Sequence, residues 1–140
     1  MSAAHVREAF RAQLSGLLGP EGFAYVESVN QAEATRDLPP NWYTLDFFPG
    51  DDSRITLGLP ALFRESGRIT VLIFTPQQQL DTVAVSAAEV IRAAMANWFD
   101  PTGMLRVLAA QPPTDLDSGD FRGSFYGITV DLLYTFDRFQ

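Results

Sequence analysis

The residue types that most often catalyse reactions are scarce in this sequence. His5 is the single histidine, and no residue near it in the chain would complete a catalytic triad or a zinc site. The chain contains no cysteine, which excludes a thiolate nucleophile, cysteine-bound zinc and a disulfide framework. We therefore expect His5 to be a surface residue of an N-terminal helix, without a catalytic or ligand-binding role.

Two acidic segments carry residue types that bind metals or transfer protons. Asp115–Asp120 is superficially similar to a calcium loop, but Gly119 comes one position early and Tyr126 stands where the bidentate glutamate belongs. The pair Asp51–Asp52 follows a Pro-Gly turn and is expected to face Arg54. Adjacent carboxylates in an open turn lack a pocket that would shift their pKa values. We interpret both segments as polar turns and expect no metal ion, no cofactor and no enzymatic activity.

The overall composition narrows the function classes further. Gly119, Gly123 and Gly127 fall in a strand-like pattern and the chain has no lysine, so there is no phosphate-binding P-loop. The net charge of −7 argues against a nucleic-acid reader, whose binding face is basic. No run approaches 18 apolar residues and no secretory signal is evident, so we expect a cytoplasmic protein without a membrane partner. The length of 140 residues predicts one domain, 1–140.

Two helices are predicted from the spacing of apolar residues. The first covers Ala3–Leu18, and its apolar stripe has spacings of four, four and three residues: Val6, Phe10, Leu14 and Leu17. The second covers Leu80–Phe99 and is rich in alanine, which favours a helix that approaches a sheet closely. Its expected buried stripe is Val83, Ala87, Val90, Ile91, Ala94 and Trp98.

Five strands are predicted, and the segment Arg64–Pro76 is expected to be the central one. Ile69, Val71 and Ile73 share one face because strand side chains alternate, while Leu72 makes the opposite face apolar as well. Such a strand is covered on both sides. The other predicted strands are Phe23–Val29, Trp42–Phe48, Met104–Ala109 and Phe121–Phe136.

This order of elements predicts an α+β fold. We expect a mostly antiparallel sheet of about four to five strands, with both helices packed on one face and an extended arm or hairpin beside them. Alternatively, Arg64–Pro76, the second helix and Met104–Ala109 form one right-handed crossover, which makes the sheet mixed.

An apolar segment, Ser53–Phe63, follows the residues Pro49–Asp52, which are expected to end a strand. Pro60 restricts this segment to an edge strand or an extended arm, because proline cannot donate a sheet hydrogen bond. Such an arm either folds back on its own core or is covered by another molecule. As a subunit interface, the arm would use Arg54, Ile55, Leu57, Leu59, Leu62, Phe63 and Arg64.

The segment from Trp42 to Ala96 has a pattern that extends beyond these elements. An aromatic-rich strand (WYTLDFFPGDD) is followed by the Ile55–Gly58 arm (Ile-Thr-Leu-Gly), and Arg64–Ile69 opens a strand that ends in Phe-Thr-Pro. An alanine-rich helix comes next. This pattern resembles the bacteriophage tail-terminator-like proteins, a family that includes minor tail protein U of lambda-like phages. The chain departs from that family at Gln77–Gln79, where the family has a glycine-rich lead into the helix.

The resemblance implies structural work in virion assembly. Proteins of this family form a ring, typically of six subunits, that caps the head-proximal end of the tail tube, stops its polymerisation and offers a surface to the head connector. The implied partners are further copies of this chain, the tail tube protein and the head–tail connector protein, with DNA only passing through the lumen. The implied locations are the host cytoplasm during assembly and then the head-proximal end of the virion tail.

Two alternatives stay open at this point. One is another neck component that joins head and tail. The other is a monomeric domain that binds a peptide or a small ligand at its sheet edge or in a pocket. For the ring itself, we expect acidic groups to face the lumen, because they would let DNA pass without binding.

Overall fold

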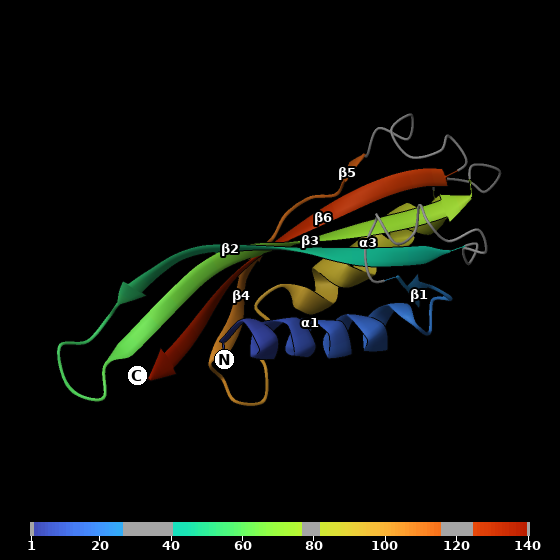
Figure 1. The fold of residues 1–140 in the computed structure, drawn as a ribbon. Helices are drawn as coiled ribbons and strands as arrows, with labels where there is room; N and C mark the ends of the chain where they lie inside the picture. Colours follow the sequence, from blue (N-terminus) through green and yellow to red (C-terminus); the bar gives the residue numbers. More distant parts are fainter. Residues whose placement is uncertain (1, 27–40, 77–81, 116–124, 140) are drawn as a thin grey trace.

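The computed structural model describes residues 2–26, 41–76, 82–115 and 125–139. Its elements in chain order are α1 (Ser2–Leu18), β1 (Ala24–Tyr25), β2 (Trp42–Arg54), β3 (Leu62–Pro76), α3 (Thr82–Met95), β4 (Leu105–Ala110), β5 (Thr114–Asp115) and β6 (Phe125–Phe139). The strands form one sheet in the order β1-β2-β3-β6-β4, and β5 pairs with β6 beside this path. β1 and β2 are parallel, and the other pairs are antiparallel. The predicted α+β class with a mixed, mostly antiparallel sheet is confirmed (Figure 1).

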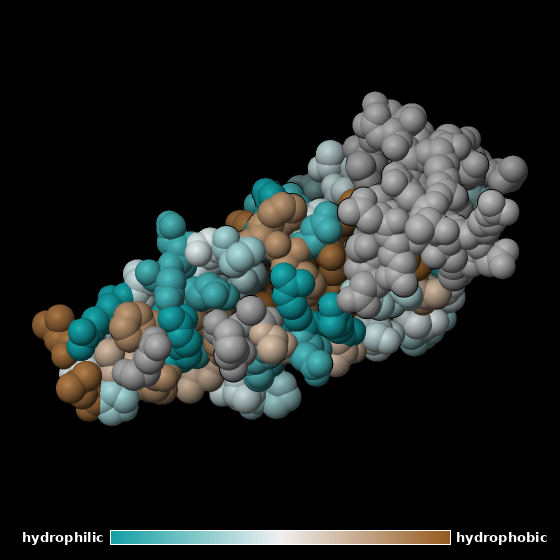
Figure 2. Space-filling model, viewed as in Figure 1, coloured by the Kyte–Doolittle hydropathy of each residue, from teal (hydrophilic) through white to brown (hydrophobic). Residues whose placement is uncertain are grey.

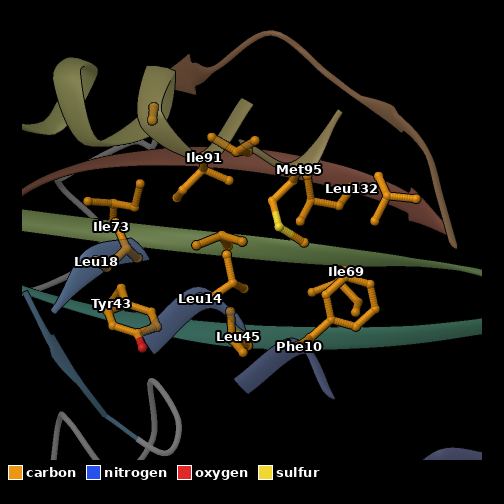
Figure 3. Packing of buried hydrophobic residues seen from close by; sticks show 14 of the residues in the cluster. Phe10, Leu14, Leu18, Tyr43, Leu45, Ile69, Ile73, Ile91, Met95 and Leu132 are labelled. Carbon is orange, nitrogen blue, oxygen red and sulfur yellow. The ribbon is translucent and has the colours of Figure 1, made fainter. Parts of the chain in front are cut away.

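The core lies between one face of the sheet and both helices. α1 turns a stripe with a spacing of four residues toward the sheet: Val6, Phe10, Leu14 and Leu18. Leu17, the predicted last member of this stripe, is only partly buried. Figure 3 shows Leu14 of α1 and Ile91 of α3 converging on Ile69 and Ile73 of β3. The predicted alternation of β3 is therefore confirmed, because its odd-numbered residues enter this core.

The second helix is shorter than predicted, and its buried stripe is different. α3 ends at Met95, and Asn97 takes a left-handed φ of 62°, a conformation that asparagine tolerates after a helix. The predicted burial of Val83 is wrong, since this residue is 36% exposed. The predicted first residue, Leu80, lies outside the described residues. The residues that α3 buries are Ala84, Ala87, Ala88, Ile91 and Met95.

The β2–β3 hairpin is much longer than the sequence indicated. The sequence predicts that a strand ends at Pro49–Asp52. In the structure β2 continues to Arg54, and a bulge between Pro49 and Asp52 shifts its register against β3. Proline is tolerated at this point because, in the described part of the chain, β1 pairs with β2 at Trp42 and Tyr43 and no strand pairs with β2 on that side at Pro49. Gly50 is required by close approach, since a Cβ there would collide with the carbonyl oxygen of Ser66.

Three other predicted strands also have different bounds. Of Phe23–Val29, the structure has β1 at Ala24–Tyr25 as a strand, and residues 27–29 lie outside the described part. β4 is shifted by one residue from the prediction, to Leu105–Ala110. β6 continues three residues beyond the predicted end, to Phe139, while residues 121–124 lie outside the described part.

The sheet face opposite the helices is organised in cross-strand rows. Trp42 stacks on Phe74, with ring centroids 4.1 Å apart. Further along, Asp46, Thr70 and Asp131 lie in one row across β2, β3 and β6, and the Thr70 hydroxyl donates to Asp131 Oδ1 at 2.6 Å. Asp46, Thr70 and Asp131 are partly exposed, in keeping with a polar row that contacts water, whereas Trp42 and Phe74 on the same face are buried.

A test of the hairpin packing is the substitution Gly67→Ala. A Cβ at Gly67 would lie 2.6 Å from the hydroxyl oxygen of Tyr134 and 2.7–2.8 Å from two of its ring carbons, and this buried ring packs edge-on against Phe10. We expect Gly67→Ala to destabilise the protein by about 1–3 kcal/mol, because the ring cannot move without disturbing the core. Thermal unfolding followed by circular dichroism measures the change.

The matched control is Gly58→Ala in the exposed loop of the same hairpin. A Cβ at Gly58 meets nothing within 4 Å. Its melting temperature should therefore stay within the error of the parent. Equal melting temperatures for the two variants would contradict the close packing of Tyr134 on Gly67.

Candidate functional site

The end of the β2–β3 hairpin carries the two most exposed large hydrophobic side chains of the described residues. We call residues 55–61, the loop between the two strands, the hairpin tip. Leu57 is 95% exposed, Leu59 is 88% exposed and Ile55 is 48% exposed. Figure 1 shows the loop beyond the N-terminal end of α1, and Figure 2 shows apolar residues at this lower left end of the molecule. Exposed leucines gathered in one loop are typical of a contact site.

The hairpin tip is held by its own hydrogen bonds. The Arg54 guanidinium donates through Nε to the Thr56 carbonyl at 2.7 Å and through Nη2 to the carbonyls of Leu57 and Gly58 at 3.0 and 3.3 Å. The Leu62 amide donates to Thr56 Oγ1 at 2.8 Å. These bonds fix the loop backbone, so the two leucines are presented in a defined position instead of collapsing onto the strands.

Ion pairs brace the strands that carry the tip. Arg64 donates to both carboxylate oxygens of Asp137, at 2.7 and 3.0 Å, and Arg138 makes a two-point pair with Asp52. Asp137 and Arg138 are adjacent in β6, so the two pairs lie on opposite faces of the sheet. The hydrogen bonds from the arginines hold the pKa of each aspartate below its ordinary value. The expectation that Asp52 faces Arg54 is wrong, because β6 supplies its partner.

The seven residues predicted for an interface divide into two groups. Ile55, Leu57 and Leu59 belong to the tip itself, and Arg54 anchors it. The other three belong to β3, where Arg64 pairs with Asp137 and the ring of Phe63 lies 5.5 Å from the Arg138 guanidinium. The alternative that the whole arm folds back on the core is wrong for the leucines of the tip, although Ala61 is buried.

A second surface feature lies beside α1, and we call it the α1 hollow. It is an open depression of about 480 Å³ between α1 and the turn that follows α3. Ala9 and Ala12 form one wall, and Trp98 and Pro101 form the other. The Trp98 ring rests on Phe10, with centroids 5.6 Å apart, which fixes that wall to the core. Sequence reasoning missed the hollow because its walls are 86 or more positions apart in the chain.

His5 and Asp100 close one end of the α1 hollow. His5 Nε2 lies 2.8 Å from Asp100 Oδ2, and the His5 ring stacks on Phe136 at 5.2 Å. Asp100 is 2% exposed and also accepts hydrogen bonds from the Thr102 hydroxyl and the Leu105 amide. His5 is partly exposed on α1, in keeping with the surface position expected for it, and its partner is supplied by a distant part of the chain. No sequence signal could have found this pair, since 95 positions separate the two residues.

The contact between His5 and Asp100 fastens α1 to the turn before β4, and we call this pair of residues the clamp. Burial raises the pKa of the Asp100 carboxyl, but the hydrogen bonds from His5, Thr102 and Leu105 outweigh it, so its pKa lies below the ordinary value. The Thr102 hydroxyl donates to the Asp100 carboxylate, with its oxygen 2.8 and 2.9 Å from the two carboxylate oxygens.

The described residues contain no group of three or more His, Cys, Asp and Glu side chains placed to hold a metal ion. The acidic segment Asp115–Asp120 lies almost wholly outside the described residues. In the described part of the chain, no helix combines the length and the apolar character that crossing a membrane requires.

Comparison with known proteins bears on the fold. No family model and no curated protein matches the chain. A solved structure, of a protein whose name states no function, is 19% identical and has a TM-score of 0.56. The match covers 100% of this chain and 96% of that one. The likeness therefore defines a shared α+β fold over the whole chain and extends no further than the fold.

A test of the clamp is the substitution Asp100→Asn. We expect a loss of about 1–3 kcal/mol of stability at neutral pH, because the buried donors around Asp100 lose a charged acceptor. A folded-state pKa below the unfolded value of about 3.9 means that the carboxylate stabilises the fold above that pH. The difference between parent and variant should therefore be full at pH 7 and shrink as the pH falls below about 4. Urea unfolding at both pH values measures it.

The matched control is Asp51→Asn, an exposed aspartate for which the described residues supply no ion pair. Its unfolding free energy should match that of the parent at both pH values. A gap for Asp100→Asn that is equally large at pH 7 and pH 3 would contradict the role of the charged carboxylate.

Proposed function

We propose that this chain is a tail-terminator-like assembly protein of a bacteriophage or prophage. Copies of the chain close into a ring at the head-proximal end of the tail tube, end its polymerisation and offer a surface to the head–tail connector protein. The single observation that carries the proposal is the hairpin tip, which holds Leu57 and Leu59 almost fully exposed at the end of a braced extension.

The physics of a closed ring explains why such a tip is useful. Each subunit of a ring makes a heterologous contact, so it needs two different patches, one for each neighbour. An apolar loop that its own chain leaves uncovered is suited to be one of these patches, because burying its leucines in a neighbour removes apolar surface from water. The fold is compatible with this role, since the sequence pattern that resembles tail-terminator-like proteins lies in an α+β domain with an extended arm or hairpin.

The charge of the chain supports the remaining parts of the proposal. A net charge of −7 suits a ring through which DNA passes without binding, because phosphate contacts require basic groups. The partners of the ring are the tail tube protein on one side and the connector protein on the other. Assembly takes place in the host cytoplasm, and the ring then stays at the head-proximal end of the tail.

The test of this proposal is the double substitution Leu57→Ser with Leu59→Ser. The parent should form a particle of about six times the subunit mass of 15.5 kDa, as a closed ring requires a fixed number of copies. The double variant should be a monomer with an unchanged melting temperature, because substitutions of exposed side chains shift stability by about 0.5 kcal/mol or less. Light scattering over a concentration series, with negative-stain imaging, measures both.

The control is Leu108→Ser, a 59% exposed leucine of β4 outside the hairpin, which should leave the particle intact. A parent that stays monomeric over the whole series and also with purified tail tubes would contradict the ring. That outcome would favour a second candidate, a monomeric domain that binds a peptide or small ligand. The α1 hollow is the observation in its favour.

A further inference from the structure

We propose that the α1 hollow is the receptor for the hairpin tip of the next copy of this chain. The inference rests on the proposed ring and names the two surfaces that meet in it. In each contact, Leu57 and Leu59 of one copy fill the hollow beside Ala9 and Ala12 of its neighbour.

The tip and the hollow match in shape and in chemistry. The tip is convex and presents two exposed leucines on a hydrogen-bonded loop. The hollow is concave, and its volume of about 480 Å³ falls in the range of about 300–1,000 Å³ that ligand sites occupy. Its walls are the methyl groups of two alanines, the Trp98 ring and Pro101, so the leucines would exchange water for apolar contacts.

The tip and the hollow also carry opposite charges. Arg54 stands at the base of the tip, and its described contacts are carbonyl oxygens of its own loop, which leave its positive charge unneutralised by a carboxylate. Glu8 lines the hollow and is exposed, and the ion pairs of the described residues do not include it. Arg54 places a positive charge beside the leucines, and Glu8 places a negative charge beside the hollow. The two charges attract each other when the tip of one copy enters the hollow of the next.

The other charges of α1 do not oppose this contact. Arg7 lies over the Phe47 ring at 4.5 Å, and Arg11 lies over the Tyr25 ring at 5.7 Å. Both aromatic partners belong to the β1–β2 side of α1, whereas the hollow lies on the side of Trp98. The two arginines of α1 therefore reach toward β1 and β2, and Glu8 stands between the two sides, because it also lines a depression beside Arg11 and Tyr25.

The tip and the hollow also lie on separate parts of the chain. The tip lies beyond the N-terminal end of α1, at the end of an extension, so a chain does not cover its own hollow with its own tip (Figure 1). A contact between two different surfaces on separate parts of the chain leaves a free tip at one end and a free hollow at the other. Repetition of that contact closes into a ring when the rotation between neighbours permits it.

The attraction between Arg54 of one copy and Glu8 of its neighbour can be tested with the charge reversal Glu8→Arg. It should weaken assembly by about tenfold, because Arg54 of the neighbour would then meet a like charge. The matched control is Glu89→Arg on α3, another exposed helical glutamate, which should assemble as the parent does. Equal assembly of the two variants, both with the melting temperature of the parent, would overturn the charge argument.

The decisive experiment is cross-linking between single-cysteine variants, since the natural chain has no cysteine to give a background. One preparation carries Leu57→Cys on the tip, and a second carries Ala12→Cys in the hollow. The two are mixed in equal amounts and treated with a short bismaleimide. The mixture should give about tenfold more cross-linked dimer than a control mixture with Gly16→Cys, which lies one turn further along α1 in open space.

Each outcome of the cross-linking experiment either supports or overturns the α1 hollow as the receptor of the tip. A dimer specific to the Leu57→Cys and Ala12→Cys mixture supports it. Stronger cross-linking within the Leu57→Cys preparation alone overturns it in favour of a two-fold contact between tips. Absence of the specific dimer, in a mixture that light scattering shows to be oligomeric, overturns the hollow as receptor and leaves the ring standing. A chain that is monomeric throughout overturns the ring and the receptor together.

Discussion

The structure depends on the unbroken pairing of β3 with β6 along 15 residue pairs, from Leu62 with Phe139 to Pro76 with Phe125. A strand rises about 3.3 Å per residue, so β3 is about 50 Å long. An α-helix rises about 1.5 Å per residue, so α1 with its 17 residues reaches about 25 Å. Helices of ordinary length cannot cover such a sheet. Roughly half of it therefore extends beyond the core, and this extension carries the hairpin tip.

Polar pairing takes the place of a core in the extension. Where the helices lie over the sheet, apolar side chains such as Ile69 and Leu132 stabilise it. Beyond them, Arg64 with Asp137 and Arg138 with Asp52 tie three strands together from opposite faces. The clamp of His5 on Asp100 lies near the transition, where the His5 ring stacks on a residue of β6. The outer half of the sheet is thus held by directional contacts, which keep its shape without a hydrophobic layer.

How much the sequence could predict follows from the range of each interaction. The alternation of β3 and β6 and the recurrence of apolar residues every three or four positions in α1 are local patterns, and they predicted the central strand, the last strand and the first helix. The residues Pro49–Asp52 have the composition of a turn, so nothing local distinguished a strand end from a bulge that Gly50 permits by its close approach to Ser66. The partners of Asp52 and His5 are 86 and 95 positions away. The hollow, built from α1 and the turn after α3, arises only in the folded chain.

The bulge between Pro49 and Asp52 has a consequence for the size of the assembly. In the proposed ring, the angle between neighbouring copies and the number of copies are one quantity, because equal rotations must add up to a full turn. A tip that is rigidly joined to the sheet transmits the local twist of its strands to the next subunit, and a bulge increases that twist. The bulged segment between Pro49 and Asp52, which has the composition of a turn, would then help to set the number of copies in the ring.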